Sequence, residues 1–274
     1  MLVETSNTVL SDQEAFVLFF DGWVSLFKEV PTFNAICILF SQTALETGHF
    51  QSMKNWNFGN IKHTSSNLVA KDHDYCLYEC GEFIHGQFQM FYPPDPVCEF
   101  NSYVSAKDGI IEYISFLAKR ERYASAWQQL LKGDPVQYCK ELKENGPYFT
   151  APLAKYTGTL VKLFNEFKIK FKELFETKSK EIQDLSFMKE EIEEKFIRGL
   201  TNISEGIHFD VEYPKYNSGV VWITLDYNKQ HILIEWQKDV GYGIHYDDPG
   251  GFPVIERHQT AIMIQAIVKE IFEI

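Results

Sequence analysis

The sequence has few cysteines, no long apolar run and no internal repeat, and these absences exclude several protein classes. No stretch of 18 or more apolar residues occurs among the 274 residues, so no transmembrane helix is expected. Residues 1–16 contain no basic segment followed by an apolar one, so we expect a chain made in the cytoplasm without a secretory signal peptide. The five cysteines are an odd number and are scattered, which indicates free thiols in a reducing compartment.

Positive charge is also scarce, and its distribution is uneven. Residues 1–172 carry 16 Lys+Arg and 19 Asp+Glu, so −9 of the net charge of −12 lies in residues 173–274. Phosphate contacts need clusters of Lys and Arg, so no nucleic acid partner is expected. The same acidity argues against simple attraction to an anionic surface and against membrane insertion.

Hydrophobic periodicity predicts an α+β chain of two domains, residues 1–172 and 181–274. The first is mainly helical, with a capping box at Ser11 and Glu14 and helical patterns over 107–123, 134–146 and 153–175. Between about 50 and 100 the helical period fails, and strand-like pieces occur at 75–78 and 82–90. We therefore expect a helical body interrupted by one small β-containing insertion.

The second domain reads as a small antiparallel meander packed on two helices. An apolar helical stripe covers 181–200, and a final amphipathic helix covers 258–274. Strand-like runs lie between them, with a tight turn at Asn228–Lys229: 207–213, 220–227, 231–236 and 242–246.

Residues 44–62, ALETGHFQSMKNWNFGNIK, place a glutamate where an apolar helix ends. Gly48 is a good helix stop, so Glu46 is expected in the last turn. The negative end of the helix dipole and burial among apolar side chains would both raise the pKa of this carboxyl. A general acid working near neutral pH needs such a pKa, whereas the alternative is a solvated glutamate at a helix end.

The same segment resembles the glucosaminidase family of peptidoglycan hydrolases, glycoside hydrolase family 73. Its first part matches A-L-E-[ST]-G-x-x-x-S through Glu46, Thr47, Gly48 and Ser52, and its second part matches N-N-x-F-G-x-K. Residues 100–117 are similar to F-R-x-Y-x-S-x-x-x-G-x-x-x-Y, and residues 145–156 look like a degraded G-Y-A-T-D-P-x-Y motif that lacks its Asp. The resemblance covers about residues 11–170 in collinear order.

The resemblance implies a lysozyme-like domain that binds a glycan strand and needs no cofactor or metal. It implies that Glu46 protonates the glycosidic oxygen while a β-1,4 bond after N-acetylglucosamine in peptidoglycan is hydrolysed. Tyr148 is then expected to face Glu46. The residues expected to contact substrate are Asn57, Phe58, Gly59, Lys62, Glu79 and Tyr103.

A second carboxylate is expected on the opposite face of the sugar. Glu82 best fits the family's T-x-E-Y-x-x-G context, although Cys80 replaces the Thr. Glu79 is the next candidate, followed by Asp72 and Asp74. The substrate's own acetamido group is an alternative to all of them.

The sequence also fits other functions and sites. A lytic transglycosylase needs only one acid, and an inactive glycan-binding or structural module needs none. Cys76 and Cys80 with His73 and His85 form a weak candidate zinc site. In the second domain, aromatic side chains could form a sugar-binding face or a core: Trp222, Trp236, Tyr242 and Tyr246.

The second domain is interpreted as a binding, targeting or assembly module with a protein partner. Without a signal peptide, an enzyme that acts on the cell wall needs another route out of the cytoplasm. We expect release through a holin as a phage lysin, carriage in a virion, or delivery by a contractile secretion machine.

Overall fold

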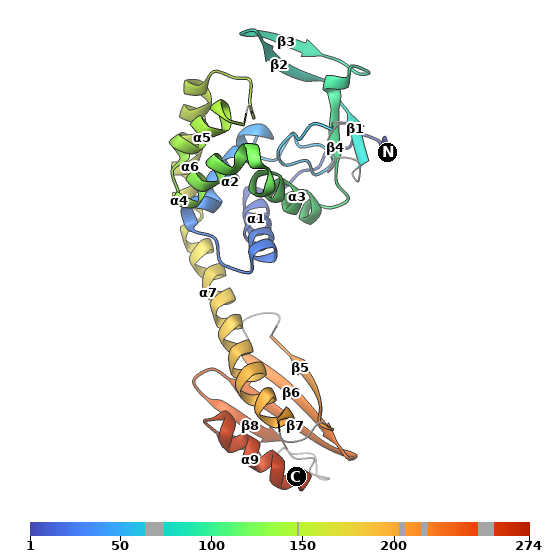
Figure 1. The fold of residues 1–274 in the computed structure, drawn as a ribbon, viewed down its shortest axis with the longest axis vertical. Helices are drawn as coiled ribbons and strands as arrows, with labels where there is room; N and C mark the ends of the chain where they lie inside the picture. The colour runs from blue at the N-terminus through green and yellow to red at the C-terminus, as the bar shows by residue number, and fades with distance from the viewer. Residues whose placement is uncertain (64–73, 147, 203–205, 215–218, 246–254) are drawn as a thin grey trace. The chain divides into compact units, whose positions relative to one another are not determined.

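The computed structural model describes the chain except for residues 64–73, 147, 203–205, 215–218 and 246–254 (Figure 1). The chain divides into two compact units, Met1–Glu176 and Thr177–Ile274, within helix α7 (Lys172–Lys189). The α+β prediction is confirmed, since small sheets accompany the helices of the first unit and an antiparallel meander forms in the second. No helix among the described residues is long and apolar enough to cross a membrane.

The first unit is a helical body with two small sheets. Its helices are α1 (Asp12–Phe27), α2 (Phe33–Glu46), α3 (Ala106–Lys119), α4 (Ala124–Lys132), α5 (Pro135–Glu144) and α6 (Leu153–Lys170), with short 3₁₀ turns η2 (Pro96–Cys98) and η3 (Glu121–Tyr123). Its strands pair antiparallel as β1 (Asp74–Leu77) with β4 (Glu99–Ser102) and β2 (Cys80–Ile84) with β3 (Gln87–Phe91). The strand-like run predicted at 82–90 is in fact a hairpin, because His85 and Gly86 both take positive φ in a tight turn.

Helix α2 forms the centre of the first unit. Every residue from Ala35 to Ala44 is buried, which fits a helix that is apolar on nearly all sides. Helix α6 packs along it, and α1 and α4 also contact it. The predicted capping box on α1 is confirmed, since Ser11 and Glu14 exchange hydrogen bonds at its first turn. A rigid central helix gives the residue at its end, Glu46, a fixed position.

The second unit is a five-stranded meander with helices on one face. Its elements are the π-helix η4 (Glu190–Ile197), α8 (Arg198–Thr201), β5 (His208–Glu212), β6 (Val220–Tyr227), β7 (Gln230–Gln237), β8 (Gly241–His245), β9 (Ile255–His258) and α9 (Ala261–Phe272). The predicted turn at Asn228–Lys229 is confirmed by positive φ at both residues. Strand β9 was not predicted because its four residues show no alternation and pair only at the edge, with β8.

The π-helix η4 has a sequence basis in its apolar spacing. Met188, Ile192, Phe196 and Leu200 recur every four residues and are all buried in the core of the second unit. Four exceeds the 3.6-residue α-helical period, so in an α-helix these side chains would drift around the axis. The wider π turn reduces that drift. Gln265 on α9 then donates to the carbonyls of Lys195 and Phe196.

One buried carboxylate lies on the sheet face opposite the helices. Glu235 on β7 and Arg257 on β9 occupy one row with Gly243 of β8 between them. Glu235 Oε1 lies 2.5 Å from Arg257 Nη2, although the angles are not those of a hydrogen bond, and only 8% of its side chain is exposed. The absence of a side chain at Gly243 leaves Arg257 room to reach across β8. This ion pair therefore ties the edge strand to the sheet.

We predict that Arg257→Met destabilises the second unit by about 2 kcal/mol. The change removes the Arg257 cation from the buried Glu235 and leaves His245, whose Nε2 lies 3.5 Å from Glu235 Oε2, as a basic neighbour. The usual cost is reduced here because Arg257 is itself partly exposed. Adding Glu235→Gln should restore most of the lost stability. The matched control Arg198→Met, which breaks an exposed pair with Glu194, should cost under about 0.5 kcal/mol. Urea unfolding of wild type and the three variants measures these values, and equal losses for Arg257→Met and Arg198→Met would contradict the prediction.

Candidate active site

The motif around Glu46 builds a tight turn at the end of α2. Glu46 is the last helical residue, and Gly48 has a φ of +55°, which confirms the predicted glycine stop. The Thr47 hydroxyl donates to the Thr43 carbonyl at 2.7 Å, and the Ser52 hydroxyl donates to the Thr47 carbonyl at 2.8 Å. Thr47, Gly48 and Ser52 therefore hold the turn, which leaves Glu46 as the motif's chemical group.

Two side chains fix Glu46 in place. The Tyr156 hydroxyl donates to Glu46 Oε1 at 2.8 Å, and Asn60 Nδ2 donates to the Glu46 carbonyl at 2.8 Å. Burial raises the pKa of the partly buried Glu46 carboxyl to about 7; the Tyr156 hydrogen bond acts in the opposite direction, and the charge of Glu82 adds to the rise. The carboxyl is thus a proton donor near neutral pH.

The loop that carries Asn60 is positioned by two glycines without room for a side chain. A Cβ on Gly59 would lie 2.6 Å from the Tyr113 ring, and a Cβ on Gly109 of α3 would lie 2.0 Å from the Trp56 carbonyl oxygen. Tyr113 in turn donates from its hydroxyl to Gln42 Oε1 at 2.9 Å. This close packing brings Asn60 to the end of α2.

Tyr148 lies in this region but does not hydrogen-bond Glu46. Its hydroxyl donates to the Gly59 carbonyl at 3.1 Å, so it holds the loop, although the Glu46 charge contributes to raising its pKa. Tyr156 takes the position on the carboxyl because its ring stacks on Phe149, with centroids 3.8 Å apart. Ala151 stands where the motif has its Asp, and α6 begins after Pro152 with no side-chain cap.

Glu82 comes close enough to Glu46 for its charge to raise the pKa of that carboxyl. Its Oε1 lies 3.2 Å from Lys62 Nζ, and its Oε2 accepts a hydrogen bond of 3.3 Å from Thr150. The Lys62 ammonium also donates to the Val97 carbonyl at 2.6 Å and to Cys80 Sγ at 3.1 Å. Lys62, predicted to bind substrate, is thus an anchor for Glu82.

The other candidate carboxylates lie elsewhere. Glu79 is exposed in the link between β1 and β2. Asp74 forms an ion pair of 2.7 Å with the N-terminal amine. Asp72 lies outside the described residues. Glu82 is therefore the acid that the structure brings to Glu46.

Four residues predicted to contact substrate are buried in the structure: Asn57, Phe58, Gly59 and Tyr103. The Asn57 side-chain amide hydrogen-bonds the backbone. It donates to the carbonyls of Ile61 and Asn101 and accepts from the Ile61 backbone N–H. Phe58 is fully enclosed in the core. These residues shape the loop from beneath rather than face a ligand.

The described residues contain no group of three or more His, Cys, Asp or Glu side chains arranged to hold a metal ion. His73 of the weak zinc candidate lies outside them, and Cys76 is buried. In the second unit, Trp236 and Tyr242 belong to the core, Trp222 lies on the opposite sheet face, and Tyr246 is outside the described residues.

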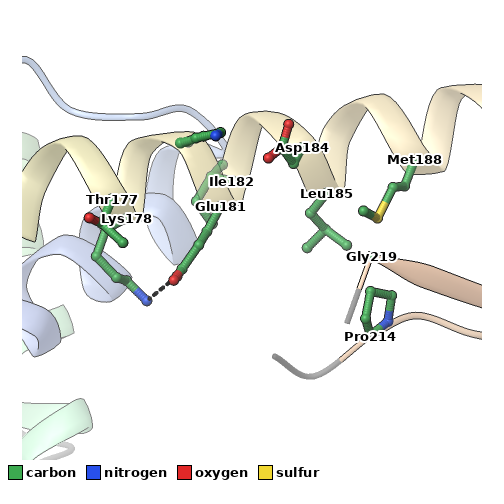
Figure 2. Close-up of a pocket in the computed structure, with 10 residues that line it drawn as sticks. Thr177, Lys178, Glu181, Ile182, Asp184, Leu185, Met188, Pro214 and Gly219 are labelled. Atoms are coloured by element: carbon green, nitrogen blue, oxygen red, sulfur yellow. Dashed lines mark ion pairs between the residues drawn. The ribbon is translucent and has the colours of Figure 1, made fainter. Parts of the chain in front are cut away.

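The second unit has a hollow of about 640 Å³ along α7 (Figure 2). Leu185 and Met188 form its apolar wall with Pro214 and Gly219, and Lys178 pairs with Glu181 at 3.5 Å near one end. None of the predicted site residues lines this hollow.

No family model, curated protein or solved structure matches this chain.

We predict that Glu46→Gln changes how stability depends on pH. The carboxyl keeps its proton to about pH 7 in the folded chain but ionises near 4.5 when unfolded. The stability that this proton confers is fully present below pH 4.5 and lost as the pH rises to 7. Relative to wild type, the variant's free energy of unfolding should therefore rise by about 2–3 kcal/mol across that window. Denaturant series measure it, and a difference independent of pH would contradict the raised pKa.

We also predict opposite shifts from the two neighbours of Glu46. Tyr156→Phe removes a hydrogen bond that favours the ionised form, so the pKa of Glu46 should rise above 7. Glu82→Gln removes a like charge, so that pKa should fall. Glu79→Gln is the control for loss of one charge nearby and should leave it unchanged. Carboxyl ¹³C NMR titration reads the pKa directly, and shifts of the same sign would refute this account of the site.

Proposed function

We propose that this chain is an endo-β-N-acetylglucosaminidase that hydrolyses β-1,4 bonds of peptidoglycan. The observation that carries the proposal is a carboxyl, Glu46, whose pKa of about 7 keeps it protonated near neutral pH at a partly exposed helix end. The collinear motifs over residues 11–170 and the helical unit with small sheets support a lysozyme-like enzyme.

In this mechanism Glu46 donates its proton to the glycosidic oxygen. The bond to the leaving sugar then breaks through an oxocarbenium-like transition state. Tyr156 already donates to Glu46 Oε1, and this bond strengthens as the carboxyl becomes a carboxylate. Burial therefore supplies a protonated acid, and Tyr156 stabilises the anion that the transfer leaves.

Glu82 is the proposed second carboxylate. It can act as a base on water or stabilise the positive charge that develops on the sugar, and both roles need the ionised form. Lys62 supplies a compensating charge at 3.2 Å, and Thr150 donates to the other oxygen. These two contacts hold the carboxylate in one orientation.

The same contacts favour a second candidate, a lytic transglycosylase. Both oxygens of Glu82 are engaged by protein groups, and transglycosylation needs only the single acid. In that reaction the sugar's own hydroxyl replaces water as nucleophile and gives a 1,6-anhydro product.

Digestion of purified peptidoglycan followed by mass spectrometry of the products tests the proposal. Wild type should release fragments with N-acetylglucosamine at the reducing end, and Glu46→Gln should lower the rate by about 10²–10⁴-fold. Activity should decline above about pH 7, where the acid loses its proton.

Glu166→Gln is the matched control, since it changes an exposed glutamate of α6 and should retain full activity. Anhydro products would support the transglycosylase instead. Peptidoglycan binding without any cleavage would identify an inactive module, and equal rates for wild type and Glu46→Gln would refute the assignment of Glu46.

A further inference from the structure

Two of the five free cysteines lie close together at the base of the β2–β3 hairpin. Cys80 opens β2, and Cys98 ends η2. Cys80 Sγ lies 3.4 Å from the carbonyl oxygen of Val97, the residue before Cys98. Burial raises the pKa of the Cys98 thiol, and the nearby Cys80 thiol adds to the rise. The two cysteines therefore lie close together without a covalent bond.

The surroundings of the two sulfurs differ in access and charge. Cys80 is partly exposed, and the Lys62 ammonium lies 3.1 Å from its sulfur, where a cation stabilises the thiolate that attacks in disulfide exchange. Cys98 is fully buried. Cys80 is therefore placed to react first and Cys98 to react with Cys80.

We propose that Cys80 and Cys98 are a reversible disulfide site that reacts with low-molecular-weight disulfides such as oxidised glutathione. The Cys80 thiolate attacks one sulfur of the reagent, forms a mixed disulfide and releases one thiolate. The Cys98 sulfur, after losing its proton to solvent, attacks Cys80 Sγ and displaces the second thiol. Two protein thiols are oxidised and one reagent disulfide is reduced to two thiols.

The cross-link would close the segment 81–97, which contains the whole β2–β3 hairpin and Glu82. Lys62 contacts both Cys80 and Glu82, so the bond forms beside the anchor of that carboxylate. A closed loop restricts the unfolded chain and thereby favours the folded hairpin. The inference concerns the thiols alone and stands independently of the proposed glycosidase activity.

The remaining cysteines provide internal controls. Cys37 on α2 and Cys139 on α5 are buried, and burial raises their pKa values to about 12 and about 11. Cys76 on β1 is buried as well. These thiols should stay reduced in the folded chain.

Incubating the folded full-length chain with oxidised glutathione, then alkylating and mapping peptides, tests the site. We expect two of the five thiols to be lost and one peptide pair to be linked, through Cys80 and Cys98. Thermal unfolding of the first unit should shift upward by roughly 5 °C, and a reducing agent should reverse both changes.

Variants separate the roles of the two sulfurs. Cys98→Ser should stop at a mixed disulfide on Cys80, whereas Cys80→Ser should leave Cys98 unreacted. If Cys98→Ser fails to fold, Cys98→Ala is read in the same way. Lys62→Met should slow the reaction of Cys80, and Lys162→Met, the same charge change on α6, should not.

Persistence of all five thiols in wild type, or a bond that joins another pair, would overturn the proposal. Equal reaction rates for Lys62→Met and Lys162→Met would overturn the assigned role of Lys62.

Discussion

The protonation of Glu46 results from two opposed interactions, and the rest of the site depends on their balance. Burial at the end of α2 favours the neutral carboxyl, whereas the Tyr156 hydroxyl favours the carboxylate. Burial alone would raise the pKa of Glu46 further, and the hydrogen bond alone would lower it. Burial has the larger effect and Tyr156 reduces it, so the pKa of Glu46 stays near neutral pH, where the carboxyl can both donate and accept a proton.

That balance requires a fixed position of the carboxyl, and tight backbone packing supplies it. Asn60 donates a hydrogen bond to the Glu46 carbonyl. In the same loop, Gly59 packs against the Tyr113 ring, and the Trp56 carbonyl packs against Gly109 of α3. Neither glycine leaves room for a Cβ. The motif glycines therefore act through packing, and the motif hydroxyls of Thr47 and Ser52 act through the turn. Most of the motif residues around Glu46 therefore hold one carboxyl in position.

This division explains what could be predicted from sequence. The helix stop at Gly48 and the capping box of α1 follow from local rules, and both could be predicted because their partners lie within a few residues. Tyr156 could not be chosen over Tyr148, since both belong to one motif and only the stacking on Phe149 decides which hydroxyl reaches Glu46. The burial of Asn57 and Phe58 could not be predicted, because a polar or aromatic residue in a loop also fits a ligand contact. In the fold, their neighbours in the core enclose them.

Lys62 connects the two reactive groups on the hairpin. A single ammonium neutralises Glu82, contacts the Cys80 sulfur and holds the Val97 carbonyl, while its charge lies over the Phe100 ring at 3.9 Å. The Cys80 sulfur and the Glu82 carboxylate share the three N–H donors of Lys62. A change in charge at the sulfur must therefore alter how strongly Lys62 interacts with Glu82. The hairpin thus couples thiol chemistry to the orientation of Glu82 through one shared cation. The pKa of Glu46 should change as well, because the Glu82 charge is one of the causes that raise it.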